Sequence, residues 1–262
     1  MSFGYQVLGF GAFPNRVAAA DFTVTLSSNV NNYNLATDLS NNGSNYGDGN
    51  WDGTSAITVV LNIDAGVTVY SANTSTPSLV VDLATSDSVL TINNSGNVVG
   101  RGGAGGVGDT SNGAAGGAGG HAMSMQDVTV TINNASGAKI QGGGGGGGAG
   151  GGNQQRGSAV DSEGVCQDGS NFIAASGGAG AGASSATSAA GSAGDNGSNT
   201  GASGAGGDFG AAGAAGAAAN ASGCKVVNGA GGAGGAAGKA IRAVSGVSQT
   251  LNNSGTVAGA TS

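Results

Sequence analysis

The chain is poor in the residues that most fibrous and soluble proteins depend on. Of its 262 residues only two are Pro, aromatic residues make up 4% and charged residues 8%, whereas 58 residues are Gly. A collagen helix needs abundant proline to stiffen its chains, and both prolines, Pro14 and Pro77, lie outside the glycine-rich half. Intrinsic disorder usually combines low hydrophobicity with high net charge. The composition therefore excludes collagen and argues against a solvated coil.

Cations are equally scarce. Lys and Arg total seven, the formal net charge is −7, and no basic stripe exists. Nucleic acid is therefore excluded as a partner, and so is binding to an anionic membrane surface. No apolar run approaches the roughly 20 residues of a membrane span, which argues against membrane insertion. The start lacks the basic region and the long apolar stretch of a secretory signal, and a protein that is released by cell lysis needs no such signal.

The residues that usually carry chemistry are nearly absent. His121 is the single histidine and Cys166 and Cys224 are the only cysteines, so neither a zinc site nor a Ser-His-Asp set is indicated. We predict no catalysis, no cofactor and no metal. A Cys166–Cys224 disulfide would close a loop of about 60 residues and stabilise the fold by ~4 kcal/mol. Two free, buried thiols are equally compatible with the sequence.

Residues 21–100 predict β structure. Short β-branched runs such as 22–26, 57–63 and 89–92 are bounded by Asn, Gly, Ser and Asp, which is typical of strands joined by turns. The polar stretch 37–54, which contains Trp51, is interpreted as a turn-rich loop.

An internal repeat links this part to the rest of the chain. Residues 89–103, 130–144 and 248–259 each carry apolar strand positions, an Asn-Asn pair, Ser-Gly or its equivalent and two further apolar positions. One copy cannot bury its apolar face alone, so the three should lie side by side as rungs, with the Asn pairs stacked at a corner. The chain must therefore leave the stack after the second copy and return to it near its end.

Glycine fills this excursion. Residues 142–152 are all Gly except Ala149. In 201–216, Gly recurs at every third position. A period of three is that of polyproline II, whose backbone groups point outward and can bond to neighbouring helices where no Cβ intervenes. The pattern predicts a bundle of polyglycine II helices, with 142–152 at its centre and 201–216 at its periphery. A flexible linker is the alternative, which the strict three-residue phase disfavours.

The predicted fold class is therefore all-β and irregular: a stacked, β-helix-like region followed by a polyglycine II bundle. Three parts are expected, namely a docking segment over 1–20, a β-rich domain over 21–100, and a polyglycine II domain over 101–262 with variable loops and returning rungs. The opening segment concentrates apolar side chains that some surface must cover. They either dock onto a carrier protein or pack on the chain's own domain; the residues are Phe3, Tyr5, Leu8, Phe10 and Phe13.

Three motifs carry a resemblance to a known family. They are TINNSGNVVGRGGAGG at 91–106, GGAGGH at 116–121 and AKIQGGGGGGG at 138–148. Together they resemble the receptor-binding adhesins at the distal tip of T-even-like phage long tail fibres, over about residues 88–260. The first 87 or so residues do not resemble that family's fibre-attachment region, and residues 3–11, FGYQVLGFG, look like the start of marine phage virion proteins.

This resemblance implies a sandwich of polyglycine II helices whose connecting loops contact outer-membrane proteins or sugars of the host. By position, the candidate recognition segments are 107–115, 153–176, 184–200 and 217–228, of which 153–176 is the richest in binding chemistry. It is either a receptor contact or a solvated loop with Phe172 packed on the bundle. The candidate receptor-binding residues are Asp109, Asn153, Gln154, Gln155, Arg156, Asp161, Glu163 and Phe172.

Three functions compete at this point. The first is a non-enzymatic tip adhesin of the virion, located outside the cell. Its partners would be a host outer-membrane protein or surface glycan and a carrier, which is a tail fibre or another virion protein. The second is a self-assembling structural filament or virion surface protein. The third is an ice-binding protein, which would need a regular face such as the alanines of 211–215.

Overall fold

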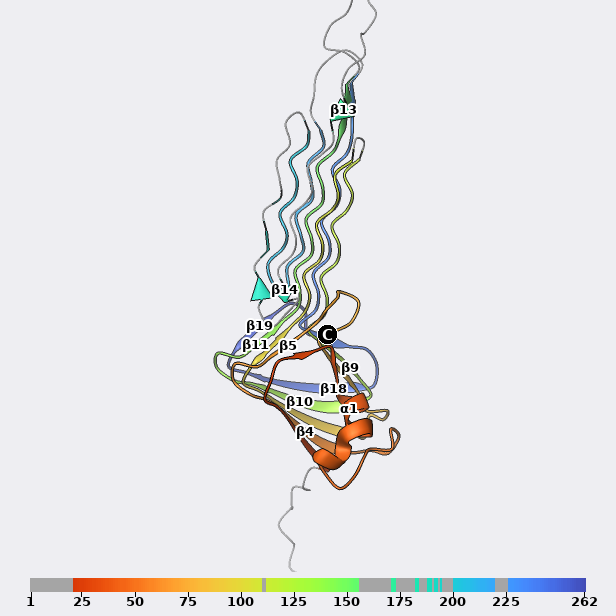
Figure 1. Cartoon of the computed structure of the whole chain (residues 1–262), viewed down its shortest axis with the longest axis vertical. Coiled ribbons are helices and arrows are strands. Elements are labelled where there is room, and N and C mark those ends of the chain that lie inside the picture. The colour runs from red at the N-terminus through yellow and green to blue at the C-terminus, as the bar shows by residue number, and fades with distance from the viewer. Residues whose placement is uncertain are drawn as a thin grey trace, which may run out of the picture.

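The structure is a computed structural model that describes residues 21–109, 112–155, 171–172, 182–183, 188–189, 191–192, 194, 200–219 and 226–262. The molecule is elongated, with a β-rich part at one end and a bundle of extended glycine-rich segments along its long axis (Figure 1). Most of its regular structure is strand, and most strands pair in parallel. Among the described residues, no helix reaches the length and hydropathy that a membrane span requires.

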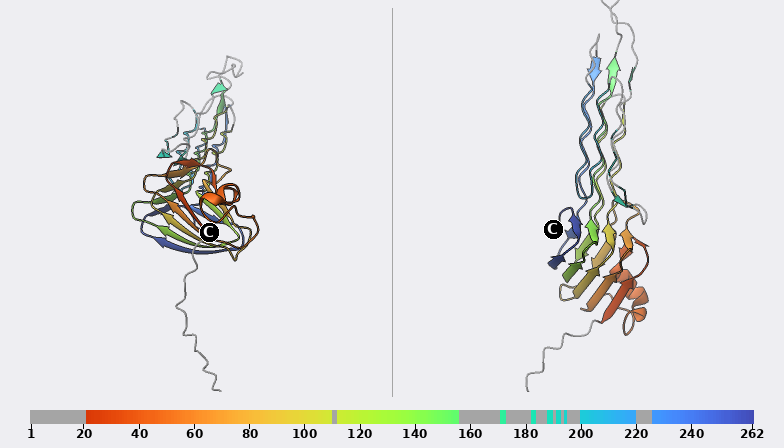
Figure 2. Two further views of the ribbon diagram at one scale, coloured as in Figure 1. Left: turned by 60° about the horizontal axis from the view of Figure 1, so that its bottom comes forward. Right: turned by 90° about the vertical axis from the view of Figure 1, so that its left-hand side faces the viewer.

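The β-rich part consists of three parallel sheets that the chain visits in turn. The first sheet holds β1 (Phe22–Leu26), β4 (Thr58–Ile63), β7 (Val89–Asn94), β10 (Val128–Asn134) and β18 (Val247–Asn253). The second holds β2 (Val30–Asn31), β5 (Thr68–Tyr70), β8 (Asn97–Val99), β11 (Lys139–Gln141) and β19 (Thr256–Ala258). The third holds β3 (Tyr33–Asn34), β6 (Leu79–Asp82), β9 (Met123–Gln126) and β17 (Ile241–Ala243). Each circuit through the sheets is one rung, and the rungs stack from β1 to β18 (Figure 2).

The sequence repeat corresponds to three of these rungs. β7, β10 and β18 pair in register, so that Thr91, Thr131 and Thr250 lie side by side. The prediction that the three copies stack, and that the chain leaves the stack and returns, is confirmed. The stack is larger than the repeat suggests, because β4 pairs with β7 and β1 pairs with β4.

The Asn pairs stack at the corner after the first sheet, as predicted. The outer column runs through Asn62, Asn93, Asn133 and Asn252. The Nδ2 of each of the last three donates to the Oδ1 of the Asn in the rung before, at 3.0, 2.9 and 2.8 Å. In the inner column, Asn94 Nδ2 donates to Asn134 Oδ1 at 2.8 Å and Asn134 Nδ2 to Asn253 Oδ1 at 2.7 Å. The inner ladder satisfies the amides of Asn94 and Asn134, which are buried and would otherwise be costly to desolvate.

The hydrophobic core lies between the three sheets. Inward side chains alternate with outward ones along each long strand, and Leu61, Ile92 and Ile132 are fully buried. Each such side chain contributes about 1.5–3 kcal/mol through burial. Leu251, in the last rung, is only partly buried because no rung follows it.

The polar stretch 37–54 is not simply a turn-rich loop, so that prediction is wrong for its first half. It contains most of α1 (Leu35–Asn42), followed by the 3-10 turn η1 (Gly43–Asn45). Leu35 and Leu39 stand four residues apart, face the core and are fully buried against the stack. Asn34 caps the helix by accepting a hydrogen bond from Thr37 N at 3.0 Å. The surrounding Asn, Ser and Gly residues conceal this short amphipathic helix in the sequence.

The glycine-rich bundle is inserted at one corner of successive rungs. In the third rung residues 100–122 separate the second sheet from the third, and in the fourth rung residues 142–240 do so. The described extended segments of the bundle are 100–109, 112–121, 142–152, 201–208, 211–219 and 229–239.

Backbone hydrogen bonds between these segments recur at every third residue. Segment 142–152 donates to 112–121 from Gly143, Gly146 and Ala149 at 2.9, 2.8 and 3.0 Å. It donates to 211–219 from Gly145, Gly148 and Gly151 at 3.0, 2.9 and 2.8 Å. Its carbonyls accept hydrogen bonds from the three remaining segments. Residues 142–152 are all buried, so the segment lies inside the bundle.

Segment 201–216 is not one continuous helix, so the prediction of a single peripheral segment is wrong. A turn at Phe209–Gly210 divides it, and Gly210 adopts a φ of +69°. The two halves then run side by side, with Ala214 N donating to Ala205 O at 2.9 Å and Ala217 N to Ala202 O at 2.8 Å. The three-residue phase continues through the turn, which is why the sequence does not reveal it.

Candidate functional site

The two ends of the long axis differ in structure. One end carries the three sheets and α1, and the other carries the small strand β13 (Figure 1). We call the latter, where the glycine-rich segments end away from the sheets, the distal end. Recognition residues are commonly found on loops that a rigid scaffold positions, so the connections at this end are the first candidates for a binding site.

A three-stranded antiparallel sheet marks the distal end. It is formed by β12 (Asn153–Gln155), β13 (Asn171–Phe172) and β16 (Val226–Asn228), with β12 in the middle. Asn153 pairs with Phe172 on one side and with Asn228 on the other. The buried central segment 142–152 runs directly into β12. The structure therefore brings the ends of candidate segments 153–176 and 217–228 together, and with them Asn153, Gln154, Gln155 and Phe172.

Candidate segment 107–115 belongs to the same end. Segments 100–109 and 112–121 run in opposite directions, and Ala114 N donates to Val107 O at 3.2 Å where the chain turns back. Val107 is 69% exposed and Asp109 is also exposed. Asn112 Oδ1 accepts a hydrogen bond from Ala230 N at 2.9 Å, which ties this turn to the start of segment 229–239.

Candidate segment 184–200 is only partly distal. Strands β14 (Gly182–Ala183) and β15 (Ser188–Ala189) pair near the sheet end of the bundle (Figure 1). Gly206 N donates to Ser192 O at 2.9 Å. Ser192 therefore lies beside the half of segment 201–208 that is nearer the turn at Phe209–Gly210. Gly201, which follows this candidate directly, donates its N–H to Gly151 O at 3.0 Å beside β12. Only the last part of the candidate therefore approaches the distal sheet.

Several residues singled out in the sequence lie outside the described residues. They are the candidate receptor contacts Arg156, Asp161 and Glu163, the cysteines Cys166 and Cys224, and the docking residues Phe3, Tyr5, Leu8, Phe10 and Phe13. Their roles stay predictions.

His121 lies at the junction of the bundle with the sheets. Its Nδ1 accepts a hydrogen bond from Lys239 N at 2.9 Å, and its carbonyl accepts one from Ser78 N at 3.3 Å. Burial lowers the pKa of the imidazole, and the charges of Arg242 and Lys239 lower it further. The neutral ring therefore joins two segments 118 residues apart, a structural role that the sequence alone does not indicate.

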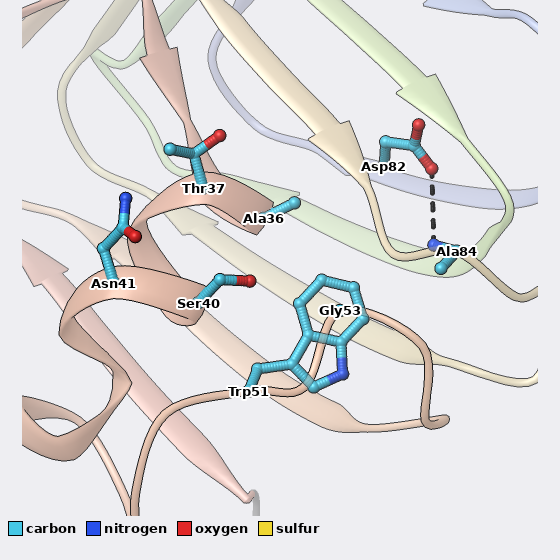
Figure 3. A pocket seen from close by; sticks show the side chains of 8 residues that line it. All are labelled: Ala36, Thr37, Ser40, Asn41, Trp51, Gly53, Asp82 and Ala84. Carbon is cyan, nitrogen blue, oxygen red and sulfur yellow. Dashed lines mark hydrogen bonds between the residues drawn. The ribbon is translucent and has the colours of Figure 1, made fainter.

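A concave surface that the sequence did not reveal lies beside α1. This depression, the α1–Trp51 depression, has a volume of about 350 Å³. Figure 3 shows the residues that line it: Ala36, Thr37, Ser40, Asn41, Trp51, Gly53, Asp82 and Ala84. Within the described part of the chain, no group of three or more His, Cys, Asp or Glu residues could hold a metal ion. The one available sequence signal for the depression is that Trp51 is the single tryptophan.

Comparisons with known proteins agree with this architecture. A family model described as phage tail fibre adhesin Gp38 matches residues 21–262. A similar solved structure is the gp37–gp38 adhesin tip complex of the bacteriophage S16 long tail fibre, with a TM-score of 0.56 and 25% identity. The match covers 92% of this chain and 82% of that chain. No curated protein matches. The family match reaches back to residue 21, so the expectation that the first 87 residues differ from this family is wrong for 21–87.

Proposed function

The chain belongs to the phage tail fibre adhesin Gp38 family, and we propose that it binds its host receptor through the distal end of the glycine-rich bundle. It is a tail fibre tip adhesin, a component of the virion that acts outside the cell. The family match favours this role over the filament and ice-binding alternatives. The role we propose is binding without a catalytic step.

The observation that carries the proposal is the convergence of connections on one sheet. β12, β13 and β16 hold together chain segments that are up to 75 residues apart, and the buried segment 142–152 supports β12 directly. A support that is buried along its whole length limits the movement of whatever it carries, which reduces the entropy lost on binding. The connection between β12 and β13 is therefore our first choice for the receptor contact.

The residue types in this connection suit a polar receptor surface. Asn153, Gln154 and Gln155 offer amide groups that both donate and accept hydrogen bonds. Arg156, Asp161, Glu163 and Phe172 add charges and one aromatic anchor, and Asp109 would lie at the neighbouring turn. A host outer-membrane protein or a surface glycan fits these groups.

We also propose that the extended segments are polyglycine II helices. The support is the spacing of the lateral hydrogen bonds: Gly143, Gly146 and Ala149 donate to Gly120, Gly117 and Ala114, three residues apart on both sides. Three residues per turn is the period of this helix, whose backbone groups point outward. At about 3.1 Å per residue, eleven residues would span ~34 Å and hold the receptor contact well away from the sheets.

The opposite end is proposed to attach to the tail fibre. The similar solved structure is a complex of gp38 with gp37, so a fibre protein is the expected carrier of this adhesin. Residues 1–20 would form the docking segment, residues 21–100 the β-rich domain, and residues 101–262 the glycine-rich domain with its returning rungs.

Labelling of host cells with the tagged, purified chain tests the receptor assignment. Replacing residues 156–170 by a Gly/Ser linker of equal length keeps β12 and β13 and should abolish labelling. The matched control replaces residues 184–187, between β14 and β15, and should label cells as strongly as wild type. Undiminished labelling by the 156–170 variant would refute the assignment.

A further inference from the structure

The charge of the chain is distributed very unevenly. Residues 21–100 contain seven Asp and no Glu, Lys, Arg or His, which gives this part a formal charge of −7. The whole chain also carries −7, so the remaining residues are neutral in sum. The seven Asp residues that carry this charge all lie in the first two rungs, on α1 or in the connection that leads into the third rung.

Most of these carboxylates lie on one side of the stack. Asp64 lies at the corner between the first and second sheets, directly after β4. The other six lie on α1, directly before β1, at the end of β6 or in the connections that lead from the third sheet back to the first. We call the surface formed by α1 and these residues the acidic face: Asp21, Asp38, Asp48, Asp52, Asp82 and Asp87.

The α1–Trp51 depression opens on this face. Ser40 and Asn41 line it from α1, and Asp82 lines it from the end of β6 (Figure 3). Asp82 is exposed, and its Oδ1 accepts a hydrogen bond from Ala84 N at 3.3 Å, which orients the carboxylate. Trp51 is 7% exposed, and its Nε1 already donates to Ser55 O at 2.9 Å. The indole thus contributes an apolar wall, while the polar groups around it remain accessible.

An aromatic wall beside a carboxylate is the chemistry that recognises a guanidinium or ammonium group, through cation–π attraction and charge-assisted hydrogen bonds. We propose that the acidic face docks a basic surface of the tail fibre protein, and that the α1–Trp51 depression accepts a Lys or Arg side chain of that surface. This inference rests on the proposed function, because it names the partner of the attached end.

Position in the molecule favours the fibre protein over other basic partners. The acidic face lies at the sheet end, away from β13, so a partner bound there leaves the distal end free for the host (Figure 1). The chain also enters the stack here, since Asp21 precedes β1 and bonds to Thr58 N at 2.7 Å. The proposed docking segment 1–20 joins the described chain at Asp21 and would share the partner. A field of one sign accelerates the encounter of oppositely charged surfaces.

The test measures binding of the full chain to the purified tail fibre protein of the same phage by biolayer interferometry. Ser40→Tyr fills the depression without changing charge, and Asp82→Asn removes the carboxylate. Asp64→Asn is the matched control, with the same charge change on the same rung but at another corner. We expect the first two to weaken binding about fivefold and the control by less than twofold. Wild-type affinity should fall as salt rises from about 50 to 500 mM.

Equal affinities for Asp82→Asn and Asp64→Asn, or an affinity that salt does not change, would overturn the proposal. Because Trp51 is the single tryptophan, its fluorescence gives a second measurement. A hexa-arginine peptide should change it saturably in the wild type and in Asp64→Asn, and more weakly in Asp82→Asn; an unresponsive wild type would contradict the site. Host-cell labelling by the same variants should be unchanged. Failure of wild-type labelling would refute the distal receptor site and leave this docking result standing.

Discussion

Gly146 tests the packing of the bundle most sharply, because it lies in the central segment with neighbours on several sides. Its N–H donates to Gly117 O at 2.8 Å and its carbonyl accepts from Gly235 N at 2.7 Å. A Cβ added at this position would overlap the carbonyl oxygen of Ala104. Gly146→Ala therefore forces segment 100–109 away from the centre or twists the central segment itself.

The size of the effect follows from these contacts. Separation would weaken about two lateral hydrogen bonds at roughly 1 kcal/mol each, and overpacking adds about 1–3 kcal/mol. The expected loss is thus about 3–5 kcal/mol, which for a chain of this size lowers the melting temperature by roughly 10 °C. Circular dichroism melts give this value, and hydrogen exchange of the glycine amides should show which segments open.

Gly117→Ala is the matched control. It changes the same residue type in a neighbouring segment, but the nearest atoms to an added Cβ are Ala104 N and O at 3.2 and 3.3 Å, so a shift of a few tenths of an ångström suffices. We expect a loss below about 1 kcal/mol. A melting temperature for Gly146→Ala within about 2 °C of wild type, or equal damage from Gly117→Ala, would refute the close-packed lateral arrangement.

Three further predictions concern the sheets and their junction with the bundle. Leu39 is fully buried, so Leu39→Ala leaves a cavity under α1. The free energy of unfolding, measured with denaturant, should fall by about 2–5 kcal/mol, and a fall of less than about 1 kcal/mol would contradict the packing of α1. Asn134→Ala removes both side-chain hydrogen bonds of the inner ladder, while Asn94 keeps its bonds to Lys139 O and Gly96 N and Asn253 keeps its bond to Gly255 N. Unfolding should therefore be easier by about 1–3 kcal/mol, and an unchanged midpoint would show that the ladder adds nothing. Folding lowers the pKa of His121, so its neutral form contributes stability above the unfolded value of about 6.5 and this contribution is lost as pH falls below it. Melting temperatures at pH 7.5 and 5 should therefore differ more for wild type than for His121→Asn, and equal differences would exclude this role.

The sequence predicts the β stack well because its signal is local and repeated. Each rung carries its own strand pattern and its own Asn pair, and Asn93, Asn133 and Asn252 then meet through the simple requirement that identical rungs stack in register. The burial of 142–152 was equally predictable, since a segment of eleven residues with a single Cβ, on Ala149, can be surrounded on every side.

The features that were missed depend on contacts distant in the sequence. The period of three in 201–216 is the same before and after the turn at Phe209–Gly210, so periodicity cannot reveal a reversal of direction. α1 is too short for a clear helical period, and Leu35 and Leu39 are recognisable as a buried pair only when the stack beneath them is known. The α1–Trp51 depression likewise joins residues from α1, the following connection and the end of β6.

Photo-crosslinking tests the central claim, that the distal end contacts the host and the sheet end does not. A benzophenone amino acid would replace Gln154 in β12 or Asn41 on α1, and each variant would be irradiated on host cells. We predict a crosslinked host component from position 154 and none from position 41. Crosslinking from position 41 alone, or equally from both, would contradict the assignment of the receptor site to the distal end.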